Sequence, residues 1–188
     1  MSERPSARAA ADRALVGYAL VRRAAIELIV AEGDDAVRHA QAEGARVETQ
    51  RWLERESLTD ALTRTERMLF DAPTASWTPE AIADGMWRKE ALGVVLWALR
   101  RIDALPTIDT EFVVEELNAA IESVGSVSAF RAAARLRDPG EVEAAWREAD
   151  TWFGATEGAV GDDRTLASIS AERSRALAWL RHASAPPA

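Results

Sequence analysis

Four charged residues are the nearest approach to a chemical site in this sequence. Arg88 and Glu90 stand where the chain enters a run, residues 91–99, that contains no charged or polar side chain. Glu172 and Arg173, near the start of the last predicted helix, are their natural complement. If the four surround an open pocket, the arginines could hold an anionic group of a ligand while a glutamate acts as acid or base.

The same four residues also fit a purely structural role. Charges at the mouth of an all-apolar helix must be paired or solvated. A buried or half-buried ion network of Arg88, Glu90, Glu172 and Arg173 would then fix how the last helix docks. The sequence leaves both interpretations open.

Aromatic residues accompany this set. Three of the seven tryptophans, Trp87, Trp97 and Trp179, fall in the same two segments and are candidates for the aromatic wall of a pocket. Large core packing is the alternative role for tryptophan side chains.

Other catalytic and metal-binding motifs are missing from the sequence. The absence of cysteine excludes disulfides, a cysteine nucleophile and thiolate metal sites. There is no dinucleotide fingerprint, phosphate-binding loop or Gly-x-Ser-x-Gly elbow. His39 and Glu43 have the spacing of a helical metal pair, but one histidine and one glutamate do not make a site. We therefore assign no catalytic residue, no metal and no cofactor.

The charge balance bears on partners. A net charge of −8 makes nucleic acid and anionic membranes poor partners and favours a basic protein or a cationic ligand. No apolar run approaches the length of a membrane span, and the start does not resemble a signal peptide. Together with the lack of cysteine, this leads us to expect a cytoplasmic protein.

One helix must position the candidate site. Thr78-Pro79-Glu80 is a strong helix start, with a cap residue, a proline at the first position and an acid in the first turn. The helix should continue to about residue 101. Because it is apolar on every side over residues 91–99, it belongs in the middle of a domain.

Helical periodicity and cap signals recur along the rest of the chain, and no convincing hairpin signal appears. We predict an all-α fold of seven or eight helices around the central one, with a small sheet near residues 107–128 as the alternative. Residues 6–182 form the single domain, between a flexible start (1–5) and a flexible tail (183–188). The expected helices cover about 6–32, 36–56, a short stretch from the Thr63 capping box through 70, 79–101, 110–124, 127–137, a stretch from 139 through 153, and 165–181.

The central and last helices carry a recognisable pattern. The segments are Trp87-Arg88-x-Glu90-Ala91-Leu92-x-x-x-Leu96-Trp97-Ala98-Leu99, then Leu105-Pro106, and Glu172-Arg173-x-x-Ala176-Leu177-x-Trp179-Leu180. They resemble the bacterial domain of unknown function 4272 family, over about residues 10–182. The resemblance implies a single, mainly helical cytoplasmic domain in which Arg88, Glu90, Glu172 and Arg173 belong to a recurring polar set.

The chain departs from that family pattern in one place. Members usually carry an Arg-x-His-Trp-like segment in the penultimate helix, after an aspartate, whereas residues 149–154 here read Ala-Asp-Thr-Trp-Phe-Gly. The missing arginine and histidine weaken any catalytic role inferred from the family.

These observations favour a non-enzymatic protein-interaction or binding domain, in one form a protein that neutralises a basic partner. The alternative is a small-molecule-binding protein or enzyme that uses the Arg88, Glu90, Glu172 and Arg173 set. A third hypothesis is a structural subunit of a larger assembly, which a large exposed apolar patch would favour. The identity of the partner and the oligomeric state do not follow from the sequence.

Overall fold

A computed structural model of the chain describes residues 4–33, 35–156 and 163–182. No strand occurs in these residues, so the all-α prediction is confirmed, and the sheet considered near residues 107–128 is not formed. The helices are α1 (Ala7–Ala31), α2 (Ala36–Arg55), η1 (a 3-10 helix, Thr59–Ala61), α3 (Arg64–Asp71), α4 (Pro79–Ala98), α5 (Val114–Glu122), α6 (Val127–Ala132), α7 (Pro139–Thr156) and α8 (Asp163–Arg181).

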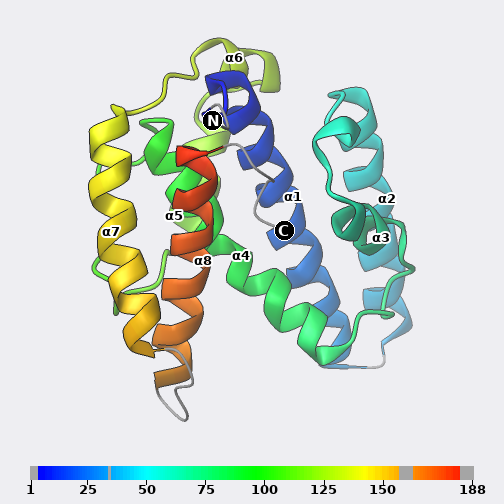
Figure 1. The fold of residues 1–188 in the computed structure, drawn as a ribbon. Helices are drawn as coiled ribbons and strands as arrows, with labels where there is room; N and C mark the ends of the chain where they lie inside the picture. Colours follow the sequence, from blue (N-terminus) through cyan, green and yellow to red (C-terminus); the bar gives the residue numbers. More distant parts are fainter. Residues whose placement is uncertain (1–3, 34, 157–162, 183–188) are drawn as a thin grey trace.

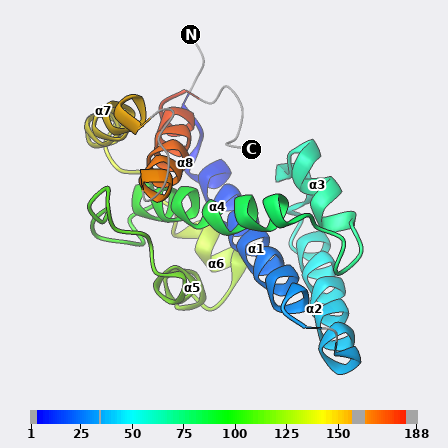
Figure 2. The same ribbon diagram turned by 90° about the horizontal axis from the view of Figure 1, so that it is seen from below.

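Helix α4 is the centre of the bundle, as the sequence predicted. It packs along α1 and α8 and also contacts α5 (Figures 1 and 2). Its N-terminal part lies near α2 and α3, while its C-terminal part lies among α5, α7 and α8 (Figure 2). Every residue from 90 to 99 is buried, which is why this stretch of the chain carries apolar side chains on all sides.

The sequence predicted the start of α4 correctly but placed its end too late. At its start the Thr78 hydroxyl accepts a hydrogen bond from the Ala81 amide at 3.2 Å, as expected of a cap. At its end the helix stops at Ala98, three residues earlier than predicted, because Arg100 adopts a left-handed conformation with φ of 59°. The Arg101 amide then donates to the Leu96 carbonyl at 2.9 Å and closes the helix.

Helix α5 begins later than predicted because its upstream residues are used for packing. Phe112 is buried against α4 at Gly93, where an added Cβ would lie 2.4 Å from the phenyl ring. Residues 111–113 are not helical, Val113 has an extended backbone, and α5 starts at Val114. The following helix, α6, is also shorter than the predicted 127–137 range.

A buried ion pair joins α1 to α3. The Arg13 guanidinium donates to both carboxylate oxygens of Glu66, and both side chains are almost completely buried. Glu66 also accepts from the Thr63 amide at 2.9 Å, while the Thr63 hydroxyl accepts from the Glu66 amide, which confirms the predicted capping box. One carboxylate therefore both caps α3 and docks it onto α1.

A second buried pair, Arg23 and Glu27, lies on α1. Glu27 accepts from the amides of Ala75 and Trp77 at 3.0 and 3.1 Å, and Arg23 donates to the carbonyls of residues 72 and 73. These contacts hold the loop between α3 and α4 against α1.

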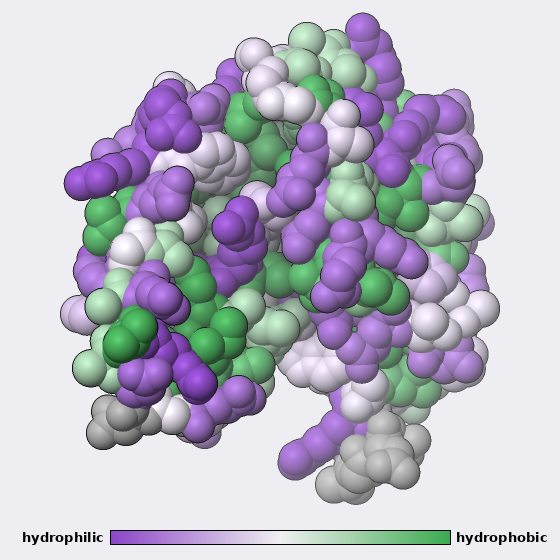
Figure 3. All heavy atoms as spheres, turned by 180° about the vertical axis from the view of Figure 1, so that it is seen from behind, coloured by the Kyte–Doolittle hydropathy of each residue, from purple (hydrophilic) through white to green (hydrophobic). Residues whose placement is uncertain are grey.

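The predicted flexible ends are only partly covered by the described residues. Arg4 donates to the carbonyls of Leu180 and Arg137 at 3.2 and 2.9 Å, and Pro5 is buried, so the fixed part of the chain begins before α1. Residues 1–3, residues 157–162 between α7 and α8, and the predicted tail, 183–188, lie outside the described residues. Hydrophilic side chains cover much of the face opposite to that of Figure 1, and its lower margin is notched (Figure 3). None of the described helices has the length and apolar character needed to cross a membrane.

The close approach of α4 and Phe112 gives a first prediction. Gly93→Ala should lower the free energy of unfolding by about 1–3 kcal/mol, because the new methyl group overlaps the buried ring. Gly44→Ala is the matched control: it adds the same group in the helix α2 with open space around it, and should raise stability by about 0.5–1 kcal/mol. Urea unfolding measures both, and equal effects of the two changes would contradict the packing described.

The Arg13–Glu66 pair gives a second prediction. Burial raises the pKa of Glu66, but Arg13 and the Thr63 amide outweigh it and hold the pKa below its usual value. A depressed carboxylate pKa stabilises the fold at neutral pH and loses that contribution as the pH falls through the folded-state pKa. Glu66→Gln should therefore lower the free energy of unfolding by about 3 kcal/mol at neutral pH. The difference in unfolding free energy between variant and wild type should become smaller in acid. Urea unfolding across pH, with exposed Glu54→Gln as control, tests this; a gap independent of pH would contradict it.

Candidate functional site

The four predicted site residues come together between α4 and α8, but as two separate pairs. Glu90 lies two positions beyond Arg88, about 200° around the helix, so the two side chains leave α4 on different sides. On α8 the neighbouring residues Glu172 and Arg173 likewise point apart. As a result Glu90 pairs with Arg173, and Arg88 pairs with Glu172.

The inner pair is sealed inside the protein. The exposed fractions of the Glu90 and Arg173 side chains are 0% and 3%. Arg173 Nε donates to Glu90 Oε2 at 2.9 Å, Nη2 lies 2.8 Å from the same oxygen within the ion pair, and the other Glu90 oxygen accepts from the Phe112 amide at 2.9 Å. Burial raises the pKa of Glu90, against the opposing effects of Arg173 and that amide.

Arg173 also binds the loop that precedes α5. Its Nη1 donates to the carbonyls of Pro106 and Thr107 at 3.0 and 3.1 Å, and its Nη2 donates to that of Thr110 at 2.6 Å. Each of the three guanidinium nitrogens therefore donates to at least one acceptor within the protein. The guanidinium carbon lies 5.0 Å from the centre of the Phe112 ring. Because all three nitrogens are bonded and the side chain is sealed, this arginine is not placed to hold a ligand.

The outer pair lies nearer the surface. Arg88 Nη1 donates to Glu172 Oε2 at 3.2 Å, and Arg175 Nη2 donates to the other oxygen at 2.6 Å. Glu172 is buried, whereas the Arg88 and Arg175 side chains are 18% and 52% exposed. Burial raises the pKa of Glu172, as does nearby Asp84, while the two arginines lower it.

Glu172 lines a cavity of about 420 Å³ between α4, α7 and α8. Trp87 and Phe153 contribute its aromatic surface, and Asp84, Arg164 and Arg175 contribute charges of both signs. Of the predicted site residues, Trp87 and Glu172 line this cavity.

The predicted aromatic wall is not assembled, because its three tryptophans do not share a cavity. Trp97 and Trp179 are buried in the core, whereas Trp87 borders the cavity just described. The Arg137 guanidinium lies over the Trp97 ring at 4.9 Å and donates to the Trp97 carbonyl, so this tryptophan anchors the segment before α7. In this case the sequence could not distinguish core packing from a ligand wall.

The described residues hold no group of three or more His, Asp or Glu side chains suited to a metal. His39 contacts the Asp35 carbonyl at 3.4 Å through Nδ1, and Glu43 accepts from Arg46 and Thr74. Arg46 and Thr74 hold the Glu43 pKa at about 2, although burial opposes them, so this exposed carboxylate is paired within the protein.

Comparison with known families gives a match over nearly the whole chain. The profile of a domain of unknown function, DUF4272, covers residues 5–186. The chain belongs to the DUF4272 family. Neither the curated proteins nor the solved structures include a match. The resemblance drawn from the central and last helices is thereby confirmed, although the family brings no activity with it.

Within this DUF4272 domain, the segment that departs from the expected pattern lies at the end of α7. Asp150 accepts from the Ser174 hydroxyl at 3.2 Å, while Trp152 and Phe153 are 41% and 38% exposed. This end of α7 therefore contacts α8 through a neutral hydrogen bond donor and carries no arginine or histidine beside the outer pair.

The two ion pairs should differ in their effect on stability. Glu90→Ala strands a sealed guanidinium and should cost about 3–5 kcal/mol of unfolding free energy. Glu172→Ala should cost less, about 1 kcal/mol, because Arg88 and Arg175 can become hydrated. Urea unfolding compares them, with exposed Glu148→Ala as control. Should Glu90→Ala not fold, Glu90→Gln preserves the acceptor for Phe112 and removes the charge. A Glu172 effect equal to or larger than that of Glu90 would contradict the assignment of inner and outer pairs.

Proposed function

We propose that this DUF4272 domain is a non-enzymatic protein-interaction domain that recognises a basic partner. The observation that supports this is the segregation of charge along the chain. Residues 102–130 contain six carboxylates and no Lys, Arg or His, and so account for six of the eight net negative charges. The six are Asp103, Asp109, Glu111, Glu115, Glu116 and Glu122.

This acidic segment, residues 102–130, occupies one side of the molecule. The loop after α4, α5 and α6 follow one another there (Figure 2). Asp103, Asp109, Glu115 and Glu116 are exposed, and no ion pair to any of them occurs within the described part of the chain. Glu111 is neutralised by Lys89. A local excess of exposed carboxylates attracts a basic surface and raises the rate of encounter with it.

Helix stability explains part of this pattern. Glu115 and Glu116 lie in the first turn of α5, whose N-cap residue, Val113, has no side chain able to cap it. Carboxylates at that position interact favourably with the helix dipole. The absence of any base as far as residue 130 needs a further reason, and recognition of a basic partner supplies one.

The alternative function is an enzyme or small-molecule binder that uses the four Arg/Glu residues. Two of them, Glu90 and Arg173, are sealed in the inner pair and cannot meet a ligand. Glu90 and Arg173 are satisfied by each other and by backbone groups. Glu172, paired with Arg88, lines a cavity and is the residue on which such a function would depend. We favour the interaction domain because four of its six acidic residues are exposed and form no ion pair within the described residues. We further propose that it acts in the cytoplasm, because a chain without cysteine forms no disulfide and does not need an oxidising compartment.

The experiment compares two variants of equal net charge. One replaces Asp103, Glu115 and Glu116 with Asn, Gln and Gln; the control replaces exposed Glu32, Glu54 and Glu148 with Gln. Each protein is immobilised, exposed to extract of its own host at low salt, and the retained polypeptides are identified by mass spectrometry. We expect a basic polypeptide to be retained by wild type and control, and lost from the acidic-segment variant.

Salt provides the second criterion. Raising the salt towards about 1 M shortens the Debye length to about 3 Å and should release the partner. Retention of the same polypeptides by both variants, or the absence of any polypeptide bound by wild type, would contradict the proposal.

A further inference from the structure

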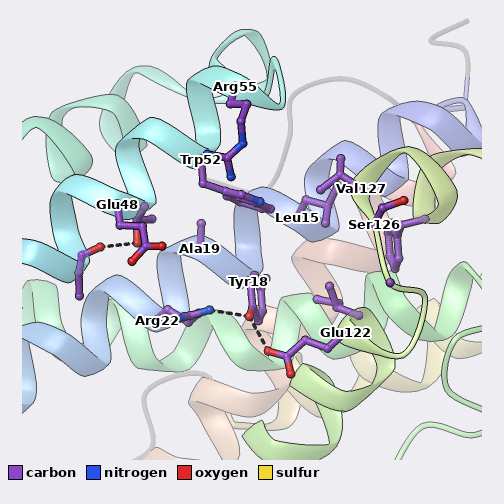
Figure 4. A pocket seen from close by; sticks show the side chains of 15 residues that line it. Leu15, Tyr18, Ala19, Arg22, Glu48, Trp52, Arg55, Glu122, Ser126 and Val127 are labelled. Atoms are coloured by element: carbon purple, nitrogen blue, oxygen red, sulfur yellow. Dashed lines mark hydrogen bonds between the residues drawn. The ribbon is translucent and has the colours of Figure 1, made fainter.

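A second cavity, of about 380 Å³, lies between α1, α2, α5 and the start of α6 (Figure 4). This volume falls at the lower end of the range for small-molecule sites. None of the residues selected from the sequence lines it, because its walls come from four segments that only the fold brings together. It is separate from the Arg88–Glu172 site and shares only Glu122 with the six carboxylates of the acidic segment.

The walls of this cavity are aromatic and aliphatic. The rings of Tyr18 and Trp52 meet edge to face, with centres 6.3 Å apart and planes at 68°. Trp52 reaches from α2 towards α1 and Leu15 (Figure 4). Phe130 and Ile121, both buried, complete the apolar lining. Trp52 itself is only half-buried, so a large aromatic side chain borders open space.

A short hydrogen-bonded chain fixes the polar end. The Tyr18 hydroxyl donates to Glu122 Oε1 at 2.8 Å and accepts from Arg22 Nη1 at 2.7 Å (Figure 4). The Arg22 guanidinium also lies over the Tyr18 ring, 5.3 Å from its centre. Burial and the bond to Glu122 raise the pKa of Tyr18, so its hydroxyl stays protonated and keeps this orientation at neutral pH.

The charges that line the cavity are not equally available. Arg22 is engaged with Tyr18, and Arg55 pairs with Glu56 at 3.5 Å. Glu122 has one oxygen beyond its bond to Tyr18, and the described residues give the Glu48 carboxylate no ion-pair or hydrogen-bond partner. Of these four charged lining groups, Glu48 is therefore the one that the described residues leave without a partner, and it and the second oxygen of Glu122 are the acceptors open to a cation.

We propose that this cavity binds a small aromatic ligand that carries a cationic group. The aromatic part packs against Trp52 and Tyr18, and the cation faces the carboxylates of Glu122 and Glu48. Aromatic faces themselves attract cations, which adds to the preference. The site rests on cavity geometry and does not depend on the proposed protein partner.

The test uses two probes with the same ring and opposite charge, tryptamine and indole-3-propionate. Binding is followed by NMR at the indole N–H signal of Trp52, which is assigned by its loss in Trp52→Phe. We expect tryptamine to shift this signal saturably, and to bind at least about tenfold more tightly than indole-3-propionate, the ratio that 1.4 kcal/mol represents.

Variants decide whether the binding occurs in this cavity. The double change Glu48→Gln with Glu122→Gln should weaken tryptamine binding about tenfold, whereas exposed Glu116→Gln should not change it. Trp52→Leu should abolish the binding detected by calorimetry, and the control Trp152→Leu, on an exposed tryptophan outside the cavity, should preserve it. Unsaturable shifts, equal binding of both probes, or tryptamine binding unchanged in the Glu48/Glu122 double variant would overturn the proposal.

Discussion

The buried pair of Glu90 and Arg173 is the interaction on which the rest of the arrangement depends. Arg173 links three parts of the chain: α8 that carries it, α4 through Glu90, and the loop of residues 106–110 through its carbonyls. Glu90 completes the connection by accepting a hydrogen bond from the Phe112 amide. Two ions removed from water are tolerated only when their hydrogen bonds are satisfied, and here those bonds hold a loop that has no regular structure of its own.

That loop determines where α5 begins and which way it faces. With Phe112 held against Gly93, α5 starts at Val114 and directs Ile121 and Glu122 towards α1 and α2. The exposed acids of the acidic segment and one wall of the Tyr18–Trp52 cavity are therefore both positioned by the same buried pair. A residue set selected for possible chemistry thus supports two surfaces that the sequence did not indicate.

Local sequence signals predicted most of the helices, and the predictions that were wrong have identifiable causes. Thr78-Pro79 and the Thr63–Glu66 box marked helix starts because cap chemistry is local in sequence. The end of α4 was missed because Arg100, rather than a glycine, adopts the left-handed conformation there. The four charged residues could be selected from their apolar surroundings, but their division into inner and outer pairs depends on helix orientation. The cavity at Tyr18 and Trp52 joins distant segments, so no local pattern could reveal it.

Hydrogen exchange at the Phe112 amide tests the central claim most directly. If Glu90 and Arg173 hold this loop, that amide should exchange as slowly as the amides of the α4 core, such as that of Val95, since opening it requires disrupting the buried pair. The neighbouring Glu111 amide, for which no hydrogen bond is found in the described residues, is the internal reference and should exchange rapidly. Equal, rapid exchange at Phe112 and Glu111 would contradict the account.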